Sequence, residues 1–367
     1  MNFSSLNYQD IKELSVHGRY IRRSQLQSVI NRNSIQNKVS QLGNSVRNSP
    51  IHKVTLGSGK IKILMWSQMH GNETTTTKAV LDLINYLNKT NELVNQILSS
   101  VTLTIVPVLN PDGAVDYTRE NANKVDLNRD AIELSQPESR ILRVLYNEIK
   151  PDYCFNLHDQ RTIFNVGSLE KPATLSFLAP AHDIQRNVSA SRGQSMKIIV
   201  AIHKALSSII PDQIGRYDDA FNPNCVGDAF QLLGTPTILF EAGHFPDDYQ
   251  REQTREFIFY SLITAISVIA QRKIEGYSLD TYFDIPENNK RYYDVLILNA
   301  NLINKKYDHN IGILYKEILN EEIIIFNPFI EATGELKDSF GHKYLDCKDQ
   351  NDLNFLKSDR KLHKLLF

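Results

Sequence analysis

The chain has 367 residues, a hydrophobic fraction of 41%, a charged fraction of 23% and a formal net charge of −1, so neither a fibrous or disordered protein nor a nucleic-acid-binding protein is expected. Its length exceeds the usual size of one hydrophobic core, which predicts a large domain and a smaller one. Three scattered cysteines are too few for a disulfide framework or a thiolate zinc site, so any bound metal must use histidine and carboxylate ligands.

At the N-terminus, residues 1–10 lack the basic and apolar regions of a signal peptide, and no window along the chain is apolar for long enough to span a membrane. We therefore expect a cytoplasmic protein with no membrane partner. Residues 7–48 are polar with spaced apolar positions, a pattern typical of short amphipathic helices on a surface.

Strand-like and helix-like segments alternate through the centre of the chain. Residues 54–56 and 61–66 are β-prone runs around Gly57 and Gly59, and they are expected to form a hairpin. The remaining expected helices are 74–86, 91–98, 135–149, 192–208 and 247–271, and the remaining expected strands are 101–109, 153–157 and 237–241. This order predicts an α/β fold with a mixed, mostly parallel central sheet flanked by helices.

Beyond about residue 273 the alternation gives way to short strand-like pieces, at 292–298, 311–315 and 322–326. We expect a catalytic domain over residues 1–274 and a small β-rich accessory domain over residues 275–367. The basic residues near its end are interpreted as a solvated tail, and the alternative is an element that narrows a cleft or binds a partner; they are Lys357, Arg360, Lys361 and Lys364.

The first chemically suggestive segment is His70-Gly71-Asn72-Glu73, which follows an apolar strand and precedes a helix. Functional groups of open α/β sheets collect at the carboxyl ends of strands, and His70 and Glu73 could converge on one ion across this turn. Gly71 would let the backbone turn sharply between them. Alone, the pattern is a weak signal, because a histidine at a strand end is more often structural.

A second strand also ends in a histidine, His158. Two strand-terminal histidines and one glutamate form the ligand set of a catalytic zinc ion that keeps one position open. The sequence therefore predicts a metal site at His70, Glu73 and His158.

A third strand, residues 237–241, ends in the single carboxylate of Glu241. Amide hydrolysis by a metal-activated water needs a base, and a carboxylate at a buried strand end suits that task. The alternative is that Glu241 caps the following helix.

Residues 110–129 form a polar stretch expected to cross the functional edge of the sheet. Its two arginines, Arg119 and Arg129, could stabilise an oxyanion or bind a carboxylate, since the guanidinium group stays charged and binds in a two-pronged geometry. The alternative is a solvated surface loop.

Together these segments resemble the zinc metallocarboxypeptidases typified by carboxypeptidase A, and the central segment is most similar to the bacterial murein-peptide amidase branch. The resemblance spans roughly residues 50–270 and rests on five motifs in the family's order: HGNE (70–73), NPDG (110–113), RENANKVDLNR (119–129), NLHD (156–159) and FEAG (240–243).

The resemblance implies one Zn²⁺ per chain, held by His70, Glu73 and His158. It also implies that Asp126 orients His70 by accepting a hydrogen bond from its second ring nitrogen, as ligand histidines usually require. The implied substrate is a peptide or other small amide.

The family's remaining roles carry over to five positions. Arg119 would polarise the scissile carbonyl, and Asn128 and Arg129 would hold the substrate's terminal carboxylate. Glu241 would take a proton from the attacking water and later protonate the leaving amine. Tyr217 is the nearest match to the family's mobile tyrosine. The sequence departs from the family at Asp130, where an aromatic residue is usual, and after Asp159, where Gln160 and Arg161 stand.

The stretch 215–228 lies where this family builds the pocket for the cleaved side chain. Its aspartates could bind a cationic group such as lysine, arginine or the amino acid end of diaminopimelate. Asp228 is the best single candidate, because Ala229 and Phe230 would fix it against the core, whereas Asp218 and Asp219 are adjacent. The alternative is ordinary turn chemistry.

Two other functions remain compatible with the sequence. One is an N-acyl amino acid amidohydrolase of the aspartoacylase and succinylglutamate desuccinylase type, which shares the H-G-x-E and D-L-N-R elements; the NPDG and FEAG elements favour a carboxypeptidase. The other is an inactive binding module. The oligomeric state is not predicted.

Overall fold

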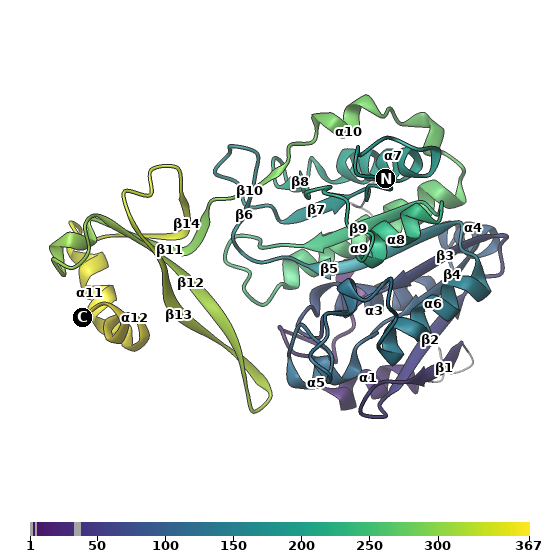
Figure 1. Cartoon of the computed structure of the whole chain (residues 1–367), viewed down its shortest axis with the longest axis horizontal. Coiled ribbons are helices and arrows are strands. Elements are labelled where there is room, and N and C mark those ends of the chain that lie inside the picture. Colours follow the sequence, from purple (N-terminus) through teal and green to yellow (C-terminus); the bar gives the residue numbers. More distant parts are fainter. Residues whose placement is uncertain (1–2, 4–5, 33–37) are drawn as a thin grey trace.

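The computed structural model describes residues 3, 6–32 and 38–367, and an eight-stranded sheet forms its centre (Figure 1). The strands of this sheet are β1 (Val39–Asn44), β2 (Pro50–Leu56), β3 (Ile61–Trp66), β4 (Val101–Val106), β5 (Tyr153–Asp159), β7 (Leu175–Leu178), β8 (Ile214–Arg216) and β9 (Thr237–Ala242). Their spatial order is β1-β2-β4-β3-β5-β9-β7-β8. The central pairs β4–β3, β3–β5 and β5–β9 are parallel, whereas β1–β2, β2–β4 and β7–β9 are antiparallel. The prediction of a mixed sheet is confirmed.

Helices cover both faces of the sheet, as the unbroken apolar runs of its strands require. Ile63 and Met65 belong to one hydrophobic core, and the alternating residues Leu64 and Trp66 belong to the other. The first core is closed by α3 (Thr75–Leu87), α4 (Glu92–Ser100), α7 (Ala190–Leu206) and α9 (Glu252–Ala270), and the second by α6 (Pro137–Ile149) and α8 (Val226–Leu232).

The expected hairpin between β2 and β3 is wrong, because β4 lies between them. Gly57 and Gly59 do not form a tight turn between paired strands. They let the chain pass against the start of β4, where a Cβ on Gly59 would lie 1.8 Å from the carbonyl carbon of Ser100. Local pattern cannot detect this insertion, since β4 comes from a later part of the chain.

The N-terminal segment packs on the outside of α3 and α9. It contains η1 (Tyr8–Asp10) and α1 (Arg23–Ile30), in agreement with the expected short helices; residues 33–37 of that stretch lie outside the described part of the chain. Asp82 on α3 accepts hydrogen bonds from Arg255 on α9 and from Tyr8, and all three side chains are buried. This network anchors the segment.

The C-terminal part contains a four-stranded sheet of order β13-β12-β11-β14 that stands apart from the central sheet (Figure 1). Its strands are β11 (Tyr292–Leu298), β12 (Asn310–Asn320), β13 (Ile323–Gly334) and β14 (Phe340–Asp346). The expected solvated tail is wrong, because residues there form α11 (Gln350–Ser358) and α12 (Arg360–Leu366). Their leucines Leu356, Leu362 and Leu366 are buried in the core of this sheet, while the basic side chains point to solvent.

The connection between the two parts holds η3 (Ile274–Gly276), α10 (Asp280–Asp284) and β10 (Asn288–Lys290), and η4 (Ala300–Leu302) follows β11. Strand β10 pairs with β6 (Phe164–Val166), so residues beyond the predicted boundary at 274 pair with the catalytic part. The boundary itself stays a prediction. No helix in the described ranges is long and apolar enough to cross a bilayer.

Several polar contacts join the C-terminal sheet to the catalytic part. Arg19 forms a two-pronged ion pair with Glu317 on β12, at 3.0 Å. Tyr249 donates to Asp294 on β11, and His342 on β14 donates to the carbonyl of Thr162. The C-terminal sheet is therefore docked close to the segment that follows β5.

Candidate active site

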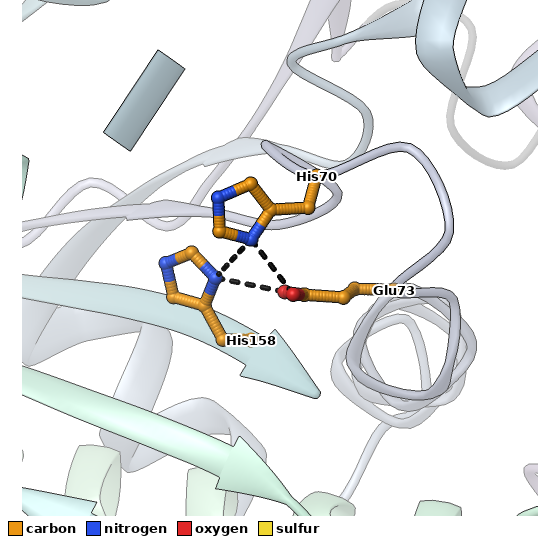
Figure 2. A group of neighbouring side chains, drawn as sticks. All are labelled: His70, Glu73 and His158. Carbon is orange, nitrogen blue, oxygen red and sulfur yellow. Dashed lines mark hydrogen bonds and ion pairs between the residues drawn. The ribbon is translucent and has the colours of Figure 1, made fainter. Parts of the chain in front are cut away.

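The side chains of His70, Glu73 and His158 converge at the carboxyl ends of β3 and β5 (Figure 2). The Nδ1 atoms of the two histidines are 3.2 Å apart. Oxygens of the Glu73 carboxylate lie 2.7 Å from Nδ1 of His70 and 2.8 Å from Nδ1 of His158. One potential ligand atom from each residue lies within 4.8 Å of the others. The sequence-predicted group is thus assembled, although its role as a ligand set stays a prediction.

Two glycines bring the loops of this site together. Gly71 lies in the expected turn, because the N–H of Glu73 donates to the carbonyl of His70 at 3.1 Å, but its φ angle is not positive. It is needed because a Cβ there would lie 1.9 Å from the carbonyl carbon of Gly113, in the loop after β4. Asn110 fixes the same loop, since its side chain accepts from the Gly113 N–H and donates to the carbonyl of Met69. Helix α5 (Pro111–Asp116) starts at this point.

Asp126 lies where a group that orients His70 is needed. Its Oδ1 is 3.0 Å from Nε2 of His70, which fixes the proton on Nε2 and turns the Nδ1 lone pair towards His158 and Glu73. Nε of Arg119 donates to Oδ2 of Asp126, at 3.0 Å, and Nη1 of Arg119 lies 3.3 Å from Nδ1 of His70. The guanidinium group therefore lies directly beside the group of three.

This donor set fits a zinc ion. Two imidazole nitrogens and a carboxylate point at one place. Packing three polar side chains so closely in a buried site costs folding free energy unless a cation or protons compensate it. Two histidines and one glutamate, with an open side towards a cleft, are the ligands that catalytic zinc prefers.

Glu241 lies next to His158 across the β5–β9 ladder. It is buried, and its Oε2 has no hydrogen-bond partner among the described residues. Burial raises the pKa of Glu241 well above its ordinary value, and the charges of Glu73 and Asp159 raise it further. Capping is excluded, because α9 begins only at Glu252. A carboxyl group whose pKa is raised in this way is suited to accept a proton and return it.

A cleft of about 850 Å³ opens beside this group. Nearly every predicted site residue lines it, and Asp126 is the exception, since it lies behind His70. The predicted residues that line the cleft are His70, Glu73, Arg119, Asn128, Arg129, His158, Tyr217, Asp228 and Glu241.

Arg129 and Asn128 lie on one wall of the cleft, on the short helix η2 (Leu127–Arg129). The Asn128 side chain accepts from the N–H of Val226 at the start of α8. Arg129 is exposed, and it donates to the carbonyl of Asn128 and to the sulfur of Cys225. Among the described residues Arg129 forms no ion pair with a carboxylate, so its charge is available to a ligand in the cleft.

Asp228 is the most confined aspartate of the predicted specificity segment. It lies on α8, accepts from the N–H of Asn222, and burial raises its pKa to about 6. Asp218 also lines the cleft, whereas Asp219 binds Arg186 and Arg192 instead. One of the two adjacent aspartates thus faces the cleft, as their spacing suggested.

Tyr217 also lines the cleft, and its ring packs against Phe164 with centroids 5.3 Å apart. Two further charged residues on the same wall were not predicted as site residues, Arg161 and Lys290. Arg161 was visible in the sequence as a departure after Asp159. No sequence feature indicated that Lys290 belongs to the cleft, because it lies beyond the predicted domain boundary.

Comparisons with known proteins find similarity to zinc carboxypeptidases. Residues 23–133 match the family model described as zinc carboxypeptidase. Probable carboxypeptidase 2 of Arthroderma benhamiae is 26% identical over 102 residues, which cover 28% of this chain and 19% of that protein. Gamma-D-glutamyl-L-diamino acid endopeptidase 1 of Lysinibacillus sphaericus is 35% identical over 80 residues, which cover 20% of each. The chain thus spans about a fifth of the length of these curated relatives.

The fold is also similar to that of solved metallocarboxypeptidases. The metallo-carboxypeptidase of Burkholderia cenocepacia superposes with a TM-score of 0.56 at 18% identity, over 69% of this chain and 70% of that one. At this identity the likeness shows the fold alone. The chain is thus similar to zinc carboxypeptidases in the sequence of residues 23–133 and in its fold.

Proposed function

We propose that this chain is a zinc-dependent carboxypeptidase, with one zinc ion held by His70, Glu73 and His158. The observation that carries the proposal is the convergence of these three side chains beside the unpartnered carboxyl group of Glu241, in a cleft that also holds Arg119 and Arg129. When bound there, zinc would act as a Lewis acid on the scissile carbonyl and lower the pKa of water.

The chain's own residues would manage the protons and the developing charge. Glu241 would take a proton from the attacking water and pass it to the leaving amine, a double task that its raised pKa favours. Arg119 would donate hydrogen bonds to the oxygen that becomes negative in the transition state. Asp126 would keep the proton of His70 on Nε2.

The proposed substrate is a peptide with a free terminal carboxylate, held by Asn128 and Arg129. A cleft of about 850 Å³ is larger than a small N-acyl amino acid needs, which favours a peptide over an acylase substrate. A murein-type peptide is one candidate, supported by the relative named gamma-D-glutamyl-L-diamino acid endopeptidase.

Metal analysis and a hydrolysis assay together test this function. The purified protein is expected to hold one zinc ion per chain, to cleave members of a mixed peptide and acyl-amino-acid library, and to lose that activity on chelation and regain it with zinc. Mass spectrometry identifies the products. Full activity after complete removal of zinc would contradict the proposal.

Replacing Arg129 tests the carboxylate clamp. A charge-assisted two-pronged hydrogen bond in a partly desolvated site is worth about 2–4 kcal/mol. Arg129→Ala is therefore expected to lower kcat/KM by the factor that corresponds to this free energy, chiefly because KM rises. Arg129→Lys should lose less, because the charge remains. Steady-state kinetics on one free-acid peptide provides the measurement, and an unchanged KM in Arg129→Ala would remove the clamp.

Replacing Asp228 tests the side-chain pocket. An ionised carboxylate in a confined wall should favour a peptide ending in lysine over one ending in leucine by about tenfold. Since the pKa of Asp228 is about 6, this preference should be complete above pH 7 and decline as the pH falls through 6 and the carboxylate is protonated.

Asp228→Asn is expected to abolish both the preference and its pH dependence, whereas Asp218→Asn should retain them. Comparing kcat/KM for peptides ending in lysine, leucine and glutamate between pH 5 and 8 gives the result. A preference for leucine or glutamate that is unchanged in Asp228→Asn would leave Asp228 as a structural residue of the loop.

A further inference from the structure

The cations that line the cleft differ in how their charges are satisfied. Arg19 is paired with Glu317 and Asp159, Arg119 is paired with Asp126, and Arg251 donates to backbone carbonyls. Three others have no ion pair with any described residue: Arg129, which is already proposed to bind the terminal carboxylate, and Arg161 and Lys290. The cleft therefore has a positive region whose charge no described side chain neutralises.

Arg161 lies on a segment that is held firmly on both sides. The carbonyl of Thr162 accepts from His342, at 2.8 Å, and the carbonyl of Ile163 accepts from the N–H of Tyr292, at 3.1 Å. Both partners belong to the C-terminal sheet. The backbone beneath Arg161 is thus fixed, while its guanidinium group is exposed in the cleft.

Lys290 reaches the same wall from the connection between the two parts of the chain. It is the partner of Phe164 in the β6–β10 ladder, and its ammonium group lies 5.8 Å from the centre of the Phe164 ring. Phe164 in turn packs against Tyr217. Arg161 and Lys290 therefore lie on one continuous wall, built by β6 and β10.

Asp159 and Asp218 also line the cleft, and Asp159 is engaged by the N–H of Thr75 and by Arg19. The carboxylate of Asp218 accepts from the N–H of Ala220 and forms no ion pair with Arg161 or Lys290, so it does not neutralise them. An anion from outside the described chain is needed for that.

We infer that Arg161 and Lys290 form a subsite for a carboxylate carried by the substrate residue on the amino side of the scissile bond. This inference rests on the proposed peptidase function. The preferred substrate would then carry two carboxylates, the terminal one and one on the residue before the scissile bond, so it is an acidic peptide.

The position of the wall supports the amino side. Asn128 and Arg129, which are proposed to hold the terminal carboxylate, contact α8 through Val226 and Cys225. The wall with Arg161 and Lys290 is instead built on β6 and β10, at the junction with the C-terminal sheet (Figure 1). A peptide anchored at Arg129 would extend its preceding residues away from α8, so its amino side is available to this second wall.

The carboxylate could come from two sources, the side chain of an α-linked acidic residue or the free α-carboxylate of a γ-linked glutamyl residue. Three acetylated peptides that end in the same residue distinguish them: one with α-linked glutamate before the scissile bond, one with γ-linked glutamate and one with glutamine. Hydrolysis by the zinc-loaded protein is followed by mass spectrometry at low and at 0.5 M salt.

One of the two glutamate peptides is expected to exceed the glutamine peptide in kcat/KM by about three- to tenfold at low salt, with a smaller ratio at high salt. Arg161→Gln combined with Lys290→Gln should bring the ratio to about one. Arg291→Gln is the matched control, because it removes the same charge from the adjacent position, which does not line the cleft, and should keep the ratio.

Hydrolysis with equal rates for all three peptides, or a preference that survives the double substitution, would overturn the subsite while leaving the peptidase function in place. Absence of hydrolysis of every peptide by the zinc-loaded protein, including the mixed library, would instead contradict the proposed function. A preference lost equally in Arg291→Gln would show a general charge effect and would also overturn the subsite.

Discussion

Glu241→Gln is expected to retain the metal and to lose hydrolysis by several orders of magnitude. One carboxyl group would serve as base and then as acid, and each of these steps is worth roughly 10²–10⁴ in rate. Glutamine has nearly the same shape but cannot exchange a proton. Because Glu241 is not one of the three converging residues, zinc content should remain that of the native protein.

The measurement is kcat on a cleaved free-acid peptide, together with zinc content after dialysis. Glu148→Gln, which changes an exposed carboxylate on α6, serves as the control and should be active. A near-normal rate in Glu241→Gln would transfer the role to another carboxylate of the cleft, either Asp159 or Asp228. Of these, Asp159 is already engaged, since it accepts from the N–H groups of Thr75 and Thr76.

His158→Ala is expected to release the zinc ion and abolish hydrolysis. Removal of one of three ligands leaves two, which cannot hold zinc through dialysis as a catalytic site does. The Nδ1 atom of His158 lies 2.8 Å from Glu73, so the substitution removes a central member of the group.

His52→Ala is a suitable control, because His52 lies on β2 and is not part of the converging group. Metal analysis of both variants after dialysis, with circular dichroism to verify folding, decides the assignment. Full zinc retention by a folded His158→Ala protein would show that the metal is held elsewhere.

The sequence predicted the parts of the fold that depend on local pattern. The apolar runs that became β3, β5 and β9 each place a functional residue at or just after their carboxyl end, namely His70, His158 and Glu241. Parallel strands bring such residues to one edge, so the group could be predicted from three separate segments. The motif order predicted further residues of the cleft, such as Arg119, Asn128 and Arg129.

Features that depend on contacts between distant segments could not be predicted in this way. The insertion of β4 between β2 and β3 leaves no periodic signal, and neither do strands as short as β6 and β10. Lys290 reaches the cleft only because β10 pairs with β6. The sequence singled out Gly71 for the freedom of its backbone. The structure shows that a glycine is needed there because Gly113, from a distant segment, approaches it closely.

The central claim is that the zinc-loaded protein removes a residue with a free carboxylate from the end of a peptide. The most direct test compares hydrolysis of peptide pairs that are identical except for a free acid or an amide at the carboxyl terminus. We expect cleavage of the last residue from the free acids and a much lower rate on the amides, because Arg129 needs a negative charge to bind. Equal hydrolysis of both forms, or cleavage within the peptides, would contradict a carboxypeptidase.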